Sequence, residues 1–240
     1  MAASTPTTFG DDCILMMHCD DFTDSSDLNL LIVNSNADLN PTTKKFGTNA
    51  IDCTAAGLDV VYARSDGLGS MVMPAEFTID YWVYMKVLPG DFTAFHSNDA
   101  LPPNFGLGGH TAVGNTYLYV NGASATRTGF AYTASSWIHC CMTRDSSNDV
   151  RVFINGNSLG TAYANAGTCA MELGAVIGIN TNFATYHDFI YDEIRLVKGT
   201  AVWTSNFTPP TAAYIGGGAP PGPEYVGISA MPLMGVGHGG

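Results

Sequence analysis

The segment "EFTIDYWVYMKVLP", residues 76–89, decides the fold of this chain. Its side chains alternate between two faces: Phe77, Ile79, Tyr81 and Val83 on one, and Thr78, Asp80, Trp82 and Tyr84 on the other. Such a repeat of two residues is typical of a β-strand. Because both faces carry aromatic rings, we expect a central strand that is covered on much of both sides.

Two Asn-Gly pairs predict hairpins further along the chain. Asn121-Gly122 and Asn155-Gly156 each separate two strand-like runs, and Asn-Gly suits a two-residue turn in which both residues have positive φ. Between the hairpins, residues 135–144 ("SSWIHCCMTR") alternate like a further strand. Other strand-like runs are "TFGDDCILMMHCDD" (8–21), "KKFGTNAIDCT" (44–54), "CAMELGAVIGIN" (169–180) and "HDFIYDEIRLVKG" (187–199). Roughly a dozen short strands without long helical periodicity indicate an all-β sandwich or barrel.

The composition divides the chain of 240 residues into three parts. Residues 1–10 form an N-terminal arm, residues 11–214 one β domain, and residues 215–240 a Gly/Pro-rich C-terminal tail. The tail holds too few apolar residues to offset the entropy of ordering by itself. We expect it to stay disordered or to order against another subunit.

The charge excludes two classes of partner. Nine basic residues stand against 21 acidic ones, a net charge of −12, and no basic cluster is present. Nucleic acid and acidic membrane surfaces both require clustered Lys and Arg. The first 13 residues lack the basic start and apolar stretch of a signal peptide, and the apolar run "CILMMH" (13–18) is too short to span a bilayer. We therefore expect synthesis in a cytoplasm and no membrane insertion.

The cysteines are predicted to be reduced. Four of the six lie in apolar strand-like runs, where a thiol acts as a small hydrophobic side chain. Zinc is the alternative at His18-Cys19 and His139-Cys140, but adjacent strand residues face opposite ways and no CxxC spacing occurs. The six positions are Cys13, Cys19, Cys53, Cys140, Cys141 and Cys169.

A set of motifs in order resembles a known family. They are "ILMMHCDDFTDSS" (14–26), "KKFGTNAIDC" (44–53), "EFTIDYWVYM" (76–85), "SSWIHCCMTRDSSNDVRVFINGN" (135–157), "VIGIN" (176–180) and "YDEIRLVKGTAVWTSNFTPP" (191–210). Together they resemble laminin G-like domains of the concanavalin A-like lectin/glucanase superfamily, of the kind found in bacteriophage structural proteins. The resemblance covers residues 11–214 and implies a jelly-roll sandwich of two antiparallel sheets. The chain departs from it at Cys140 and Cys141, where the family usually has Val and Ala.

The resemblance implies a function without catalysis. The expected role is a virion surface or structural protein (capsid decoration, fibre or tail component). Its partners would be other virion proteins, in a homo-oligomer or a capsid or tail lattice, and it could also contact host glycans. The alternative is a carbohydrate-binding lectin or adhesin module, and a glycosidase is a distant third.

The carboxylate pair Asp192-Glu193 argues against the glycosidase. Neighbouring strand residues face opposite ways, whereas two catalytic acids must converge on one glycosidic bond. Glucanases of the superfamily carry E-x-D-x-E on one strand, and this chain has no such string. We therefore predict no catalytic residues and no enzymatic activity.

The resemblance also implies a structural calcium between the first and last strands. Asp20 and Asp21 from the opening strand, with Asp192 or Asp188 from the closing one, are the candidate ligands, because calcium binds several oxygens. No other cofactor is expected. The alternative is that Asp192 accepts hydrogen bonds from backbone amides and Glu193 is solvated.

Aromatic side chains beside polar groups are the candidate glycan ligands. Tyr186, Trp203 and the segment 96–110 offer this chemistry. The alternative is that these rings pack in the protein, with Trp203 and Phe207 attaching the C-terminal segment to the sandwich.

Overall fold

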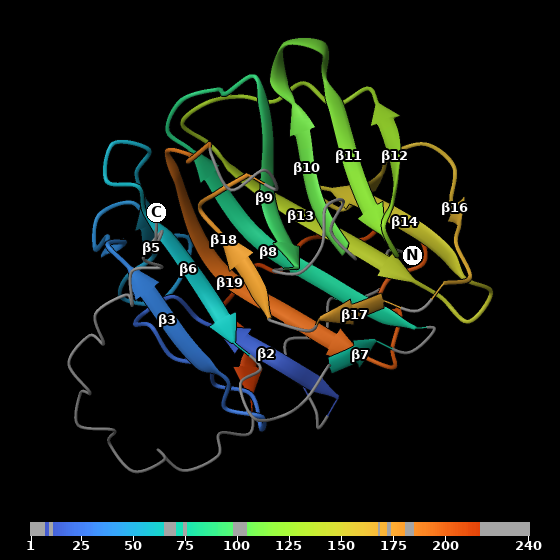
Figure 1. The fold of residues 1–240 in the computed structure, drawn as a ribbon, viewed down its shortest axis with the longest axis horizontal. Coiled ribbons are helices and arrows are strands. Elements are labelled where there is room, and N and C mark those ends of the chain that lie inside the picture. The colour runs from blue at the N-terminus through green and yellow to red at the C-terminus, as the bar shows by residue number, and fades with distance from the viewer. Residues whose placement is uncertain are drawn as a thin grey trace, which may run out of the picture.

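The computed structural model describes residues 8–9, 12–64, 71–73, 76–97, 105–167, 169–171, 174–180 and 185–216. Within these ranges the chain is all-β, apart from one 3-10 turn, η1, at Thr111–Val113. Two large antiparallel sheets pack face to face (Figure 1). The predicted jelly-roll sandwich is confirmed. Most of the predicted arm, and the predicted tail from residue 217 onward, lie outside the described residues.

One sheet has nine strands and is centred on the 76–89 segment. Its order is β15 (Asn157–Ser158), β14 (Asp149–Ile154), β13 (Trp137–Arg144), β8 (Phe77–Met85), β19 (Phe189–Lys198), β5 (Ile51–Cys53) and β4 (Asp38–Leu39), with β16 (Tyr163–Ala164) beside β14 and β2 (Cys13–Met17) beside β19. The central strand β8 pairs with β13 on one side and β19 on the other. The sequence prediction of a central strand is therefore correct.

The other sheet has seven strands. Its order is β12 (Ala123–Thr128), β11 (Asn115–Val120), β10 (Phe105–His110), β9 (Asp91–Ser97), β18 (Ala175–Ile177), β6 (Val60–Arg64) and β3 (Leu31–Ser35). Two small pairs complete the fold: β1 (Thr8–Phe9) runs parallel to β20 (Ile215–Gly216), and β7 (Met71–Met73) is antiparallel to β17 (Cys169–Met171).

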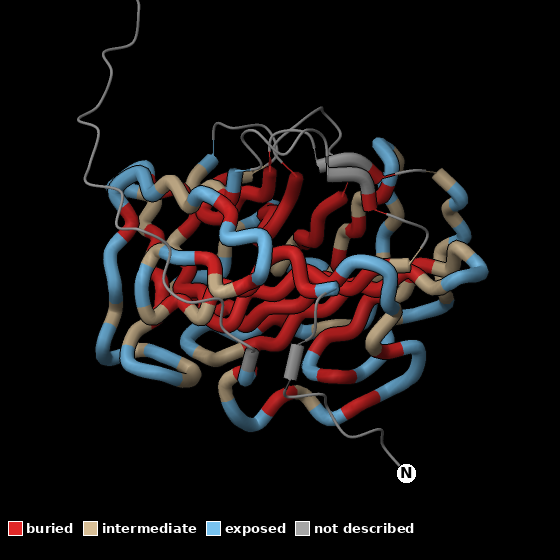
Figure 2. Tube along the Cα trace, turned by 90° about the horizontal axis from the view of Figure 1, so that it is seen from below, coloured by how far each residue is buried: buried red, intermediate tan, exposed pale blue. Residues whose placement is uncertain are grey.

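The core fills the space between the two sheets (Figure 2). It includes the four side chains that alternation grouped on one face of β8, namely Phe77, Ile79, Tyr81 and Val83. All six cysteines are buried thiols, as expected of small core side chains. Burial raises the pKa of Cys13 and of Cys140 to about 12, so both thiols stay protonated at neutral pH.

Both Asn-Gly hairpins are confirmed. Asn121 and Gly122 have φ of 52° and 68° between β11 and β12, and Asn155 and Gly156 have φ of 50° and 76° between β14 and β15. Positive φ at both positions is the backbone of a type I′ turn. Turn chemistry alone therefore located these two connections.

The expected strand at residues 44–54 is mostly a loop. Only Ile51–Cys53 forms a strand, and Gly47 has φ of +55°. The carboxylates of Asp192, which is buried, and Asp20, which is partly exposed, accept hydrogen bonds from the backbone amides of the loop. These bonds replace the ladder bonds that a strand would make.

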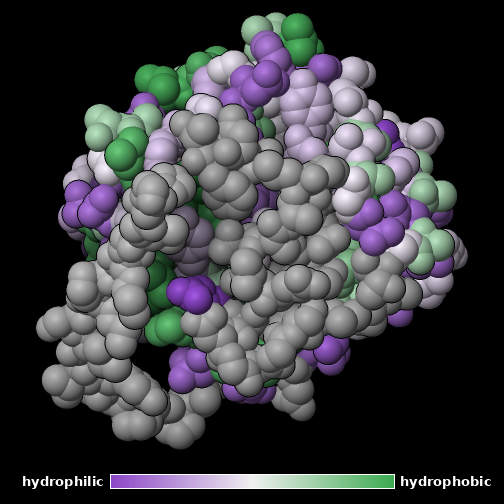
Figure 3. Space-filling model, viewed as in Figure 1, coloured by the Kyte–Doolittle hydropathy of each residue, from purple (hydrophilic) through white to green (hydrophobic). Residues whose placement is uncertain are grey.

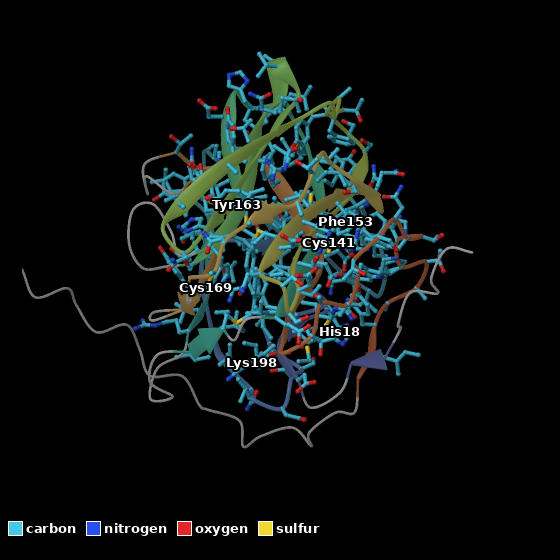
Figure 4. The ribbon with its side chains drawn as sticks, turned by 90° about the vertical axis from the view of Figure 1, so that its right-hand side faces the viewer. His18, Cys141, Phe153, Tyr163, Cys169 and Lys198 are labelled. Carbon is cyan, nitrogen blue, oxygen red and sulfur yellow. The ribbon has the colours of Figure 1, made fainter. Side chains whose placement is uncertain are left out.

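The segment after β19, residues 199–214, crosses the outer face of the nine-stranded sheet, and we call it the C-terminal strap. The rings of Trp203 and Phe207 stack with centroids 4.1 Å apart in a cluster with Cys141 and Phe153, which lie close together in Figure 4. Thr143 Oγ1 donates a hydrogen bond to the carbonyl of Trp203 at 2.9 Å. The predicted anchoring role of these two aromatic residues is confirmed.

Candidate functional site

The outer face of the seven-stranded sheet carries four half-exposed tyrosines, Tyr62, Tyr117, Tyr119 and Tyr186, which we call the tyrosine face. Strand register places Tyr119 of β11 opposite Gly106 of β10, and Gly106 opposite His96 of β9. The row continues through Val176 of β18 to Tyr62 of β6. Two tyrosines therefore stand on each side of the sheet centre. Figure 3 looks onto this side of the molecule, where moderately polar surface gathers over β10–β12.

Tyr62 and Tyr186 form one half of the face. They pack on a small apolar cluster of Val60, Val176 and Ile179, and Tyr186 makes a β-bridge to Ile179. Burial, with a smaller contribution from Tyr186, raises the pKa of Tyr62. The Tyr62 phenol is therefore a neutral hydrogen-bonding group at neutral pH.

Tyr117 and Tyr119 form the other half of the face. The Tyr117 hydroxyl donates to Asp91 Oδ1 at 3.4 Å, and the Tyr119 side chain hydrogen-bonds to Thr93. Thr93 Oγ1 in turn donates to Asn180 Oδ1 at 2.8 Å. This chain of bonds ties β11 to β9 and to the segment that carries Tyr186.

Gly106 and Gly108 leave the outer face of strand β10 without side chains between the two halves. A Cβ at Gly106 would lie 2.9 Å from Cβ of His96, and one at Gly108 would lie 2.2 Å from the carbonyl oxygen of Phe92. Any larger residue would therefore push the neighbouring strand away. Aromatic rings with hydroxyl groups around a bare strand can stack on an apolar ring face and exchange hydrogen bonds with polar groups around it.

The seven strands of this sheet contain one acidic residue, Asp91. Cleavage of a glycosidic bond requires two converging carboxyl groups in most such enzymes. The strands of the tyrosine face therefore do not supply that pair.

Only one of the two predicted glycan ligands lies on this face. Tyr186 is half-exposed there. Trp203 is 2% exposed and lies in the strap on the opposite sheet, so it cannot present its ring to a ligand. Residues 98–104 of the predicted segment 96–110 lie outside the described residues.

The Asp192-Glu193 pair is structural. Asp192 Oδ2 accepts hydrogen bonds from the amides of Lys45 and Phe46 at 2.7 and 3.0 Å, as one of the two sequence hypotheses expected. The expectation of a solvated Glu193 is wrong, because Glu193 is 1% exposed. Its Oε1 lies 3.0 Å from His18 Nδ1, and its Oε2 accepts the amide of Tyr214 at 2.9 Å.

A β-bulge explains why simple alternation failed at this pair. The register between β19 and β8 shifts between Asp192 and Arg195, and Glu193 has φ of +49°. The extra residue is not part of the regular ladder, so its side chain does not follow the alternation of the strand. Glu193 thereby reaches the opening strand and the end of the strap.

The predicted calcium ligands Asp20, Asp21 and Asp192 all accept hydrogen bonds from protein groups. Asp20 Oδ1 accepts the amides of Thr48 and Asn49, and Asp21 accepts a hydrogen bond from Thr23. In the described part of the chain, no three His, Cys, Asp or Glu side chains are grouped to hold a metal ion. Calcium needs six to eight oxygens, so the calcium hypothesis has no support among these residues.

A buried polar network lies beneath the strap and was not predicted. Asp80 accepts hydrogen bonds from Arg195 Nε at 2.8 Å, from Tyr214 Oη and, at 3.2 Å, from His139 Nε2. Burial alone would raise the pKa of Asp80, but the guanidinium of Arg195 and the His139 bond hold it below its usual value. The alternation of β8 placed Asp80 on the face opposite Ile79 and Tyr81, but nothing in the sequence pairs it with residues 59, 115 and 134 positions away.

The comparisons with known proteins agree with this architecture. The laminin G model described as "Concanavalin A-like lectin/glucanases superfamily" matches residues 61–203. No curated protein matches the sequence. No helix within the described ranges has the length and apolar character needed to cross a membrane.

Two solved structures illustrate the shared fold. The ligand binding domain of botulinum neurotoxin serotype D, in complex with N-acetylneuraminic acid, is 14% identical with a TM-score of 0.59; the match covers 78% of this chain and 48% of that one. Domain 4 of AbnA, an extracellular arabinanase of Geobacillus stearothermophilus in complex with arabinotriose, is 17% identical with a TM-score of 0.59, covering 83% and 96%. This chain thus spans about half of the toxin domain and nearly all of the arabinanase domain. Because the family model matches more than half of its 240 residues, the chain belongs to the concanavalin A-like lectin/glucanase superfamily as a laminin G-like domain.

Proposed function

We propose that this chain is a non-enzymatic carbohydrate-binding domain that acts on the surface of a virion. The observation that carries the binding function is the tyrosine face, where Tyr62, Tyr117, Tyr119 and Tyr186 stand around a glycine-lined strand. Sugar rings have apolar faces and polar edges, so tyrosines, which combine an aromatic ring face with a hydroxyl group, suit them.

Two further observations support binding without catalysis. Asp91 is the one acidic residue in the strands of the face. Most glycosidases need two carboxyl groups, so these strands lack the second one. Both neighbours named above were solved with a sugar bound, N-acetylneuraminic acid in one and arabinotriose in the other. At 14% and 17% identity they suggest the class of ligand and not the particular sugar.

The virion setting rests on the sequence. The ordered motifs resemble the bacteriophage variety of the family, and only 12% of the residues are charged. On a virion, such a domain would serve as a capsid decoration, fibre or tail component and attach the particle to glycans of the host. A free lectin is the alternative, and mass spectrometry of purified particles from the source distinguishes the two: absence of the chain from particles would contradict the virion setting.

A glycan array with the full chain tests the binding function. We expect Tyr62→Ala and Tyr119→Ala each to weaken binding to the best glycan by about two- to tenfold, because one stacked aromatic contributes about 0.5–1.5 kcal/mol. The matched control is Tyr84→Ala, because Tyr84 is half-exposed on the nine-stranded sheet, where its ring is in a tilted contact with Trp137. Failure of the chain to bind any glycan, or an equal loss in the control, would overturn the proposal.

A further inference from the structure

Strand β3 is an open edge of the seven-stranded sheet. Among the described strands it pairs with β6 alone, from Leu31 opposite Arg64 to Ser35 opposite Val60. The backbone groups on its other side are therefore available to a further strand. An exposed edge of this kind is a template for pairing with another chain.

The sequence of β3 lacks the features that normally protect an edge. Residues 31–35 read "LIVNS", with no charge and no proline, and their register to β6 has no bulge. The opposite edge, β12, carries Arg127. Charges, prolines and bulges keep natural edges from associating, so their absence at β3 indicates an edge that is covered in the working protein.

Exposed leucines surround this edge. Leu31 is 56% exposed, Leu28 just before it 40%, and Leu58 55%. Asn36 Nδ2 donates to the carbonyl of Gly57 at 3.2 Å, which holds the turn of Leu58 beside the end of β3. Burying these side chains together with the strand would add apolar contact to the backbone hydrogen bonds.

We propose that β3 pairs with β3 of a second copy of this chain. Antiparallel pairing about a two-fold axis at Val33 places Leu31 opposite Ser35 and Ile32 opposite Asn34, so the uncharged strand is its own complement. Pairing of the two β3 strands would join the seven-stranded sheet of one copy to the seven-stranded sheet of the other, which makes one continuous sheet.

Charge also favours this edge for self-association. Two copies of a chain with net charge −12 repel each other, and an uncharged strand is where that repulsion costs least. The nearest acids in the sequence, Asp27 and Asp38, flank the strand on either side. Added salt screens them, so we expect it to strengthen the dimer.

The dimer would bring two tyrosine faces onto one surface. Val33 lies opposite Tyr62 in the register of β3 and β6, so Tyr62 is one strand away from the two Val33 residues that would meet at the two-fold axis. Three strand spacings of about 4.8 Å then separate the two Tyr62 residues, roughly 14 Å. This consequence depends on the proposed function, whereas the interface itself does not.

Analytical ultracentrifugation of the full chain tests the interface. We expect a species of twice the 25.3 kDa chain mass at micromolar concentration. Leu31→Lys and Ser35→Lys should each weaken it at least tenfold, because an edge lysine resists pairing. Val113→Lys is the matched control, since Val113 is 62% exposed in η1.

Disulfide trapping tests the register. Val33→Cys should form an intermolecular disulfide on mild oxidation, because residues opposite each other in an antiparallel pair lie about 4.5–5.5 Å apart. Val113→Cys should not. A chain that is monomeric at every concentration, or a dimer that survives both lysine variants and forms no disulfide in the Val33→Cys variant, would overturn the proposal.

Discussion

At the scale of single residues, the fold places the carboxyl group of Asp192 where its charged form is unfavourable. Its side chain is fully buried, and its Oδ1 has no hydrogen-bond partner among the described residues. Burial raises its pKa to about 7, against the lowering effect of the Phe46 and Lys45 amides; Glu193 and Asp20 raise it further. The native state therefore takes up a proton near neutral pH that the unfolded chain does not.

The pH dependence of stability should reveal this proton. Between the unfolded pKa of about 4 and the folded value, the native state binds more protons, so Asp192 lowers the free energy of unfolding as pH rises. Asp192→Asn keeps an acceptor and removes the titration. We expect wild type to lose about 2–4 kcal/mol relative to this variant between pH 4 and pH 8 in urea unfolding.

Subtracting the free energy of unfolding of the Asp192→Asn variant from that of wild type at each pH removes the contributions of other titrating groups that the two proteins share. His18, whose pKa is raised by its bond to Glu193, also loses its contribution as pH rises, whereas burial lowers the pKa of His187 to about 4, which acts in the opposite direction between pH 4 and 6.5. Parallel pH profiles for wild type and variant would show that Asp192 does not hold this proton.

Individual residues were predicted where the strand pattern is regular. Alternation grouped Phe77, Ile79, Tyr81 and Val83 on one face of β8, and these four side chains belong to the core, whereas Asp80 and Trp82 of the other face do not. It failed at Glu193, because a bulge with positive φ is not visible in a pattern of apolar residues.

At the scale of elements, the C-terminal strap should stabilise the whole nine-stranded sheet. Trp203 is 2% exposed and its ring stacks on Phe207. Trp203→Ala should lower the free energy of unfolding by about 3–5 kcal/mol, the usual cost of removing a large buried aromatic. Chemical denaturation measures this, with Val202→Ala as the control, because Val202 is only half-buried. A loss in the free energy of unfolding below about 1 kcal/mol would mean that packing of the strap contributes little to the stability of the sheet.

Elements with local signals were the predictable ones. Strands β8 and β13 have alternation over nine and eight residues, and the two hairpins have Asn-Gly turns. The loop of residues 44–50 was not predicted, because its shape depends on Asp20 and Asp192, which are distant in sequence.

At the scale of the whole molecule, the six buried thiols should report global unfolding. The pKa of each of Cys13, Cys19, Cys53, Cys140 and Cys141 is raised, chiefly by burial, so little thiolate is available for reaction. We expect no alkylation of the native chain without reductant and six modified cysteines per chain after denaturation, measured by intact mass. If two cysteines stayed unmodified and the chain were two mass units lighter than its fully reduced form, a disulfide would be present, which would contradict the prediction of reduced cysteines.

The sandwich could be predicted from the sequence, but the tyrosine face could not. Short alternating runs and turns specify strands, and the ordered motifs specify their arrangement. The face, by contrast, depends on the pairing of β9 with β18 and of β18 with β6, which joins segments about 80 and 115 residues apart. Tyr186 was identified from its residue type, whereas Tyr62, Tyr117 and Tyr119 needed the sheet order.

The parallel pairing of β1 with β20 determines how the domain would carry mechanical force. Thr8 lies opposite Ile215 and Phe9 opposite Gly216, so the chain enters at one end of the pair and leaves at the other. A pull on both ends of the described chain would slide the two strands past each other and strain their hydrogen bonds together. An antiparallel pair pulled at its open end would instead lose its hydrogen bonds in succession. The terminal pair is thus a shear contact, loaded before the rest of the sandwich.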